Sequence, residues 1–295
     1  AVTTGDRNTA MGENAGLNLT TGNENVIIGY QAFFHGTTAT DCVAIGDHCM
    51  SSVTTGSNNT AIGRVALGAN TTGADNVAVG SIALDANTTG NQNIAIGKNS
   101  LGANTTGSEN IAMGQSALES NTTTSNNVAI GSGALGQTTG GDNTAIGKGA
   151  GNSVAGGTNN TCIGFSALPS SGNASNVITL GNSSVGTLRC QVTSISGLSD
   201  ERDKTAIEDL PVGLDFINTL KPRKFTWAMR EASANDGKTQ TGFIAQELQT
   251  AVGSIDYLNL VMDDNPEKLE ATPANLIPIL VNAIKELSAK VTALE

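Results

Sequence analysis

The sequence repeats itself every 17 residues from its beginning to about residue 181. One unit runs from Asn59 to Asp75, and Asn76 begins the next. A glycine closes an Ala-Ile-Gly step in each unit, at Gly12, Gly29, Gly46, Gly63, Gly80, Gly97, Gly114, Gly131, Gly147, Gly164 and Gly181. Every spacing is 17 residues except the one from 131 to 147, which is 16. A short fixed period is typical of stacked supersecondary units, so we expect a solenoid rod.

Each unit predicts a short strand, as in Thr60-Ala61-Ile62, where β-branched residues alternate with alanine. An Ala-Leu pair such as Ala66-Leu67 predicts a second strand, and Thr-Thr-Gly at residues 71–73 predicts a tight turn. Two strands and two turns describe one flattened coil of a parallel β-roll. Eleven such coils at ~4.8 Å each give a rod of roughly 50 Å.

The predicted strand has one face of large apolar residues and one face of alanine. A flattened coil has a single interior, so the other face meets water or another chain. Rows of Ala and Gly let backbones approach closely, and we therefore expect the small-residue face to be a packing surface between chains. This favours an oligomer, with three rods packed together as the expected form.

Two polar columns run along the repeat. Asparagine recurs four residues before the glycine, as at Asn59 and Asn76, and stacked amides of this kind can form a hydrogen-bonded ladder. The position before it holds several carboxylates, namely Glu24, Asp41, Asp75, Glu109 and Asp142. Paired carboxylates can hydrolyse glycosides. Because these recur at turns, we expect a solvated face instead.

One unit of the repeat is irregular and rich in aromatic residues. It contains Tyr30, Phe33, Phe34 and His35, and Asp47-His48 follows in the next unit. One interpretation is a local cap or packing feature. The other is a receptor-recognition patch on an otherwise uniform rod.

Composition changes where the repeat ends. Residues 1–198 carry 5 Lys/Arg and 10 Asp/Glu, whereas residues 199–295 carry 10 and 16, together with the only tryptophan. A net charge of −11 argues against a nucleic-acid partner, which needs a basic face. The four cysteines lack zinc-ligand spacing, so we expect no metal, and we expect no cofactor. We also expect no membrane insertion, since no apolar run has spanning length.

The repeat units resemble the head repeats of trimeric autotransporter adhesins and of similar phage fibres. This resemblance covers about residues 1–181 and implies a left-handed parallel β-roll assembled as a trimer. Residues 182–198 break the repeat and are expected to form an extended neck.

Residues 199–295 carry a different set of motifs. Ser-Asp-Glu-Arg-Asp-Lys at 199–204 is followed by Leu-Lys-Pro at 220–222 and Gly-Phe-Ile-Ala-Gln-Glu at 242–247. The segment 213–220 predicts a helix and 224–227 a strand. The end predicts a helix with a coiled-coil seam, made of Ile277, Leu280, Ile284, Leu287, Val291 and Leu294. This order of motifs is similar to the intramolecular chaperone domain of phage tailspikes and fibres, the peptidase S74 family, so we expect a small α+β chaperone domain.

In that family the domain helps a trimer to fold and then cuts itself off before the serine of the first motif. The resemblance implies cleavage between Leu198 and Ser199, with Ser199 as the nucleophile and Lys204 as its base. A serine hydroxyl is inert unless a base takes its proton, and a lysine does so only where burial or positive charge lowers its pKa. Arg202 would supply such charge, and Asp200 would position the strand or the lysine.

The sequence therefore predicts a receptor-binding phage tail fibre, a homotrimer of the virion assembled in the host cytoplasm. Its receptor would be a glycan or protein of the host surface, and its one activity a single-turnover autoproteolysis. A bacterial trimeric surface adhesin or filament is the first alternative. A glycan-degrading tailspike is the second.

Overall fold

The computed structural model describes residues 4–185, 188, 199, 201–228, 237–263, 267 and 269–294. The chain divides into two compact units, Ala1–Asn182 and Ser183–Glu295. Most of the predicted neck, 182–198, lies outside the described residues.

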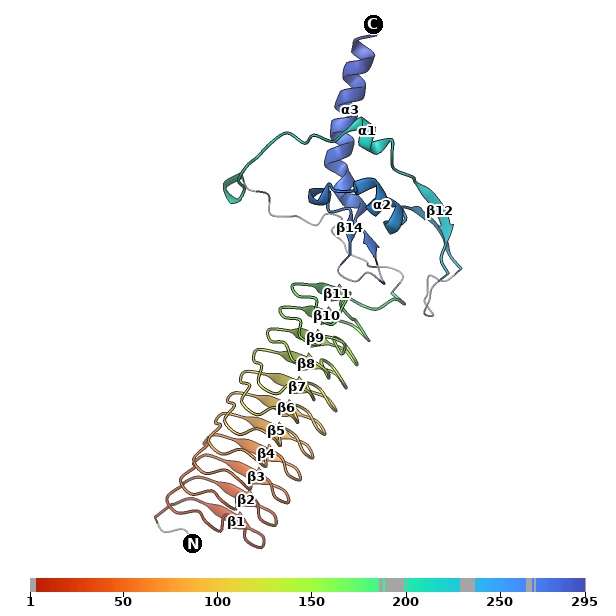
Figure 1. Cartoon of the computed structure of the whole chain (residues 1–295). Coiled ribbons are helices and arrows are strands. Elements are labelled where there is room, and N and C mark those ends of the chain that lie inside the picture. The colour runs from red at the N-terminus through yellow and green to blue at the C-terminus, as the bar shows by residue number, and fades with distance from the viewer. Residues whose placement is uncertain are drawn as a thin grey trace. The chain divides into compact units, whose positions relative to one another are not determined.

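The first unit is a stack of coils in which each coil contributes one three-residue strand to a parallel sheet (Figure 1). The strands are β1 (Thr9–Met11), β2 (Val26–Ile28), β3 (Val43–Ile45), β4 (Thr60–Ile62), β5 (Val77–Val79), β6 (Ile94–Ile96), β7 (Ile111–Met113), β8 (Val128–Ile130), β9 (Thr144–Ile146), β10 (Thr161–Ile163) and β11 (Ile178–Leu180). Equivalent residues of successive coils pair, as Ala61 does with Ala78. The predicted parallel β-solenoid is therefore confirmed.

The second strand predicted for each coil is wrong. Ala66 and Leu67 lie in a run of turns that follows Gly63. Leu67 has a φ of 53°, and the equivalent leucines of the neighbouring coils share this left-handed conformation. That conformation reverses the chain and places the leucine side chain inside the coil, where it is fully buried.

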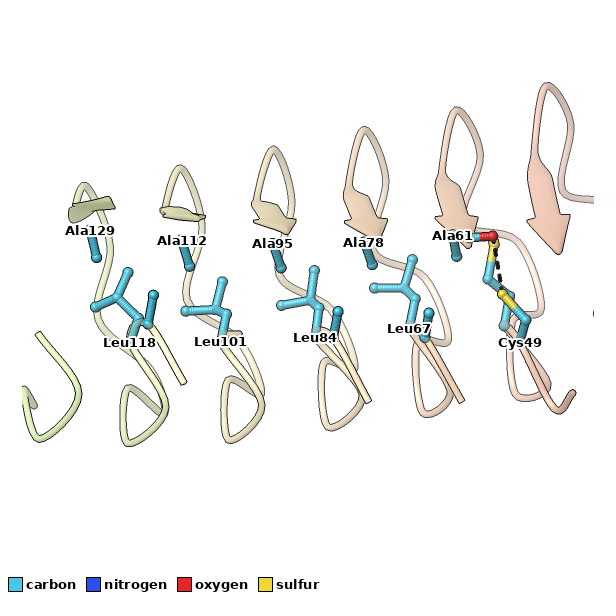
Figure 2. Packing of buried hydrophobic residues seen from close by; sticks show 14 of the residues in the cluster. Cys49, Ala61, Leu67, Ala78, Leu84, Ala95, Leu101, Ala112, Leu118 and Ala129 are labelled. Carbon is cyan, nitrogen blue, oxygen red and sulfur yellow. Dashed lines mark hydrogen bonds between the residues drawn. The ribbon is translucent and has the colours of Figure 1, made fainter. Parts of the chain in front are cut away.

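The two apolar faces of the strand are reversed relative to the prediction. Figure 2 shows the strand alanines, such as Ala78 and Ala95, pointing inward toward the leucines of the opposite turn, such as Leu84 and Leu101. All four side chains are fully buried. The coil is too thin to enclose two large residues facing each other, so a leucine opposite an alanine fills it at normal packing density. Cys162 takes the place of an alanine in the strand column, Cys49 takes the place that Ala66 has one period later, and both are buried.

The large residues of the strands consequently face outward. The first and third residues of each strand from β2 to β10 are half-buried or exposed, whereas the middle residue is buried. In each of the eleven strands the third residue is Ile, Val, Met or Leu, and neither the first nor the third residue is charged. We call this surface, made of the first and third residues of β1 to β11, the outer sheet face. Its third residues form an unbroken column of large apolar side chains along the whole stack, and threonines occupy four of its first positions.

Buried asparagines bond from coil to coil, which confirms the predicted ladder. The backbone N–H and the Nδ2 of Asn76 both donate to Asn59 Oδ1, at 2.9 and 3.2 Å, and Nδ2 also donates to Gly90 O at 2.9 Å. The acidic residues one position earlier are exposed, as expected. The asparagine row therefore satisfies buried backbone groups and is not a ligand site.

The repeat glycine is required by close approach of successive coils, and this yields a stability prediction. Gly80 has a φ of 139°, and a Cβ there would lie 2.6 Å from Gly97 O. We expect Gly80→Ala to destabilise the rod by about 3 kcal/mol or more, from strain plus overpacking. Gly133→Ala is the matched control, because Gly133 also has positive φ but nothing within 4 Å, so about 1 kcal/mol is expected. Thermal and urea unfolding of both variants measure the difference, and equal losses would contradict the packing argument.

The second unit contains helices α1 (Leu214–Ile217), α2 (Ala245–Val252) and α3 (Leu276–Thr292). Its strands form two antiparallel hairpins, β12 (Arg223–Thr226) with β13 (Thr239–Gly242), and β14 (Val261–Met262) with β15 (Glu270–Ala271). Short 3-10 helices are η1 (Glu201–Asp203), η2 (Asp256–Leu258) and η3 (Pro273–Asn275). The predicted terminal helix is present. The helix predicted at 213–220 is limited to Leu214–Ile217, and the strand predicted at 224–227 is found at Arg223–Thr226. The small core consists of Phe216, Leu258, Leu260, Leu276 and Ile279.

Candidate functional site: a serine–lysine pair

A serine and a lysine meet near the start of the second unit. At the end of η1, the Lys204 N–H donates to Glu201 O at 3.1 Å. The tight turn directs the lysine side chain back toward Ser199. Lys204 Nζ donates to Ser199 Oγ at 2.7 Å and to the Ser199 carbonyl oxygen at 3.1 Å. The five-residue spacing therefore places the predicted nucleophile within hydrogen-bond reach of the predicted base.

The surroundings of this pair are open in the single chain. Both Ser199 and Lys204 are exposed, and Arg202 lies between them in sequence, within η1. Leu198 and Asp200 lie outside the described residues, so the roles assigned to them remain predictions. The single chain brings the side chains of Ser199 and Lys204 together but does not enclose them.

A charged pair links two of the sequence motifs of the second unit. Arg223 follows the Leu-Lys-Pro turn, and Glu247 ends the Gly-Phe-Ile-Ala-Gln-Glu motif. Arg223 Nε donates to Glu247 Oε2 at 2.9 Å, and Nη2 donates to Oε1 at 2.5 Å. This bidentate ion pair links β12 to α2. The hydrogen bonds from Arg223 also lower the pKa of Glu247. Sequence reasoning identified both motifs but missed that they pair.

We expect this link to weaken in acid. Because the folded-state pKa of Glu247 lies below its ordinary value of 4.5, the stability it contributes is present above pH 4.5 and lost as the pH falls through the folded pKa. Glu247→Gln should therefore remove part of the acid sensitivity of the second unit. Hydrogen exchange of β12 and α2 amides between pH 5 and pH 3 measures it, with Glu270→Gln as a control on another strand. Identical pH profiles for wild type and Glu247→Gln would contradict this assignment.

The irregular coils of the rod separate the predicted receptor residues. Phe33 is fully buried with a φ of 55°, in the column that Leu67 occupies two periods later. Its inclusion in a receptor patch is therefore wrong, because the repeat places this position inside the coil. Phe34 and His35 make an edge-to-face contact of 4.9 Å between ring centroids, and His35 is exposed.

Tyr30 lies in a separate polar cluster. Its ring contacts that of His48, with centroids 5.3 Å apart, and its hydroxyl accepts a hydrogen bond from Gln31 Nε2 at 3.1 Å. His48 Nδ1 lies 2.7 Å from Asp47 Oδ1. Gln31, Asp47 and His48 were missed as neighbours of Tyr30, although the 17-residue period aligns Tyr30 with Asp47 and Gln31 with His48.

Other kinds of site are not found among the described residues. No group of three or more His, Cys, Asp or Glu side chains in this part of the chain could hold a metal ion. None of the helices described is long and apolar enough to cross a membrane. Burial raises the pKa of the Cys42 thiol to about 11 and that of Cys49 to about 12, which makes both unreactive at neutral pH.

Comparison with known proteins identifies the second unit. Residues 199–256 match the sequence model of the peptidase S74 family, described as the chaperone of endosialidase. No curated protein and no solved structure matches the chain. The matched segment begins at Ser199 and includes Lys204, Arg223 and Glu247. A domain of this family implies homotrimeric assembly. The chain therefore carries a peptidase S74 intramolecular chaperone domain at its C-terminal end, after a parallel β-solenoid.

Proposed function

We propose that this chain is a homotrimeric phage tail fibre whose C-terminal domain directs assembly and then cleaves itself off between Leu198 and Ser199. The observation that carries the cleavage is the 2.7 Å hydrogen bond between Lys204 Nζ and Ser199 Oγ, at the first residue of the family match. The chaperone domain also favours a phage fibre over a bacterial adhesin, because such domains are typical of fibre proteins.

The chemistry proposed is an acyl transfer within the chain. Lys204, once deprotonated, takes the Ser199 hydroxyl proton while Oγ attacks the Leu198 carbonyl carbon. The bond from that carbon to the Ser199 nitrogen breaks, and the nitrogen leaves as an amine after taking a proton. Water then hydrolyses the ester on Oγ, which gives a carboxylate at Leu198 and restores the serine hydroxyl.

Assembly supplies the condition that the exposed pair lacks. A lysine gives up its proton readily only where water is excluded or positive charge is near. In the proposed trimer a partner subunit covers Ser199 and Lys204 and provides this environment. Cleavage then follows folding, and the cut trimer becomes kinetically stable because it has lost the element that assembled it.

The outer sheet face is the surface through which the rods pack in this proposal. Ile130, Ile146 and Ile163 are 38%, 41% and 42% exposed on it. A continuous apolar surface of this extent marks an interface in soluble proteins. Three such faces packed around an axis would bury one another, and the same arrangement would align the coils of the three chains.

Host attachment is the role proposed for the rod. Tyr30 and His35 are exposed aromatic side chains on irregular coils, and they are candidate contacts to a host-surface receptor. Cleavage and assembly are tested together by native mass spectrometry of the purified protein before and after denaturation. The proposal expects a native trimer that separates into two fragments when denatured. A monomer, or an intact 29.8 kDa chain from a folded trimer, would contradict it.

A further inference from the structure

Helix α3 has a buried apolar face and an exposed apolar face. Ile279 and Ala283 are buried against the core of their own unit. An adjacent face is exposed and carries the predicted coiled-coil seam, made of Ile277, Leu280, Ile284, Leu287, Val291 and Leu294. Two half-buried polar residues, Asn282 and Glu286, lie one turn apart on the side of the helix that faces its own chain.

These two polar side chains hold a segment that is about 70 residues away in sequence. Asn282 Nδ2 donates to Leu210 O at 3.1 Å and to Val212 O at 2.9 Å. Glu286 Oε2 accepts a hydrogen bond from the Leu214 N–H at 2.9 Å, at the start of α1. Residues 210–214, which we call the anchor segment, are therefore fixed to α3 by three hydrogen bonds.

The anchor segment lies a short distance along the chain from the serine–lysine pair. The described side chains between 199 and 209 are exposed, and Leu210 is the first that is half-buried. Leu210 is six positions after Lys204, so Lys204 lies within about 20 Å of the anchor segment along an extended chain. Through Asn282 and Glu286, this sets an upper limit on the distance between the pair and α3.

We propose that Asn282 and Glu286 are positioning residues for self-cleavage. They limit how far the serine–lysine pair can lie from the oligomerisation seam, so that a partner subunit can cover it. This inference rests on the proposed self-cleavage and goes beyond it by assigning two residues that lie outside the family match, which ends at 256. Asn282 and Glu286 point away from the seam. Their substitution is therefore expected to change cleavage without changing trimer assembly.

The experiment compares five variants of the full chain with the wild type. Asn282→Asp keeps the shape of the side chain but removes both N–H donors. Glu286→Ala removes the acceptor for the Leu214 N–H, whereas Glu286→Gln keeps one oxygen acceptor and serves as the conservative rescue. Lys290→Ala is the matched control, because Lys290 is exposed on the same helix. Gly213→Ala adds an independent test, since a methyl group there would collide with the Glu286 carboxylate.

Each variant is translated in a cell-free system and sampled over time. Native gels separate trimers, and a denaturing second dimension reports the fraction cleaved within them. We expect Asn282→Asp, Glu286→Ala and Gly213→Ala to slow cleavage within trimers by roughly ten- to a hundredfold, because releasing the anchor segment lowers the effective concentration of the pair at the position that a partner subunit covers. Glu286→Gln and Lys290→Ala should cleave at close to the wild-type rate.

Each other outcome overturns a defined part of the proposal. Wild-type rates in trimers of Asn282→Asp and Glu286→Ala would refute the positioning role while leaving self-cleavage intact. Variants that form no trimers would also refute it, because the residues would then be assembly determinants. A wild type that never cleaves would refute the proposed self-cleavage itself and the inference with it.

Discussion

On a denaturing gel the wild-type protein is expected to run as two bands of about 20 and 10 kDa, divided after residue 198 of a 29.8 kDa chain. Ser199→Ala is expected to run as a single band at full length. The physical reason is that this variant lacks the hydroxyl oxygen that attacks the Leu198 carbonyl, so no ester forms. The loss should be complete on the time scale of purification, because uncatalysed peptide hydrolysis is slower by many orders of magnitude.

Substitutions at Lys204 test whether this side chain acts by accepting a proton or only through its positive charge. Lys204→Met removes the amine, and Lys204→Arg keeps a positive charge that cannot be given up. Both should block cleavage if the lysine acts as a base, whereas Ser199→Cys should retain some because a thiolate is also a nucleophile. These three variants and Ser199→Ala should still form trimers. Cleavage by Lys204→Arg at the wild-type rate would show that the lysine does not take the proton.

Charging the outer sheet face is expected to abolish assembly. In the uncleaved Ser199→Ala background, Ile130→Lys with Ile146→Lys should convert a trimer of about 90 kDa into monomers of 29.8 kDa. Both isoleucines face outward, so the single chain can still fold around its alanine and leucine columns. In the trimer each lysine would be buried without a partner charge in three copies, at a cost of several kcal/mol for each.

The control for this prediction is a lysine on a different side of the same coils. Thr123 is exposed in a bend outside the strands, and Thr123→Lys should leave the trimer intact. Sedimentation or light scattering gives the mass, and circular dichroism checks that the coils remain folded. Trimers that tolerate both lysines in the sheet face would place the interface elsewhere. An unfolded double variant would show instead that the face belongs to the core of the single chain.

The residues of the α3 seam do not by themselves specify a three-stranded coiled coil. Ile277, Ile284 and Val291 alternate with leucines at the other core positions, a pattern that favours two strands in isolated parallel coiled coils. The trimer that the S74 domain implies must therefore be specified by the rest of the assembly. In the proposed assembly, the outer sheet face would supply that specification.

Sequence reasoning reached the serine–lysine pair through motif resemblance but could not show its geometry. Ser199 and Lys204 lie five residues apart in the sequence, and it is the 3-10 turn of η1 that brings Nζ within 2.7 Å of Oγ. The pairs made by Arg223 and by Asn282 were missed because each joins residues 24 to 72 positions apart. No local pattern encodes such partners.

The 17-residue period by itself determined that this chain forms stacked parallel coils, since a repeat can bury its apolar side only against its neighbours. It also placed the asparagine ladder, because one equivalent position per coil must lie above the next. Only the tertiary structure decided which apolar face turns inward. The left-handed turn at Leu67 directs the leucines into a coil that has room opposite them for alanine alone, and this sends the isoleucines outward. The strand pattern left open which of the two apolar faces lies on the outside of the coil. In the structure it is the face of large residues.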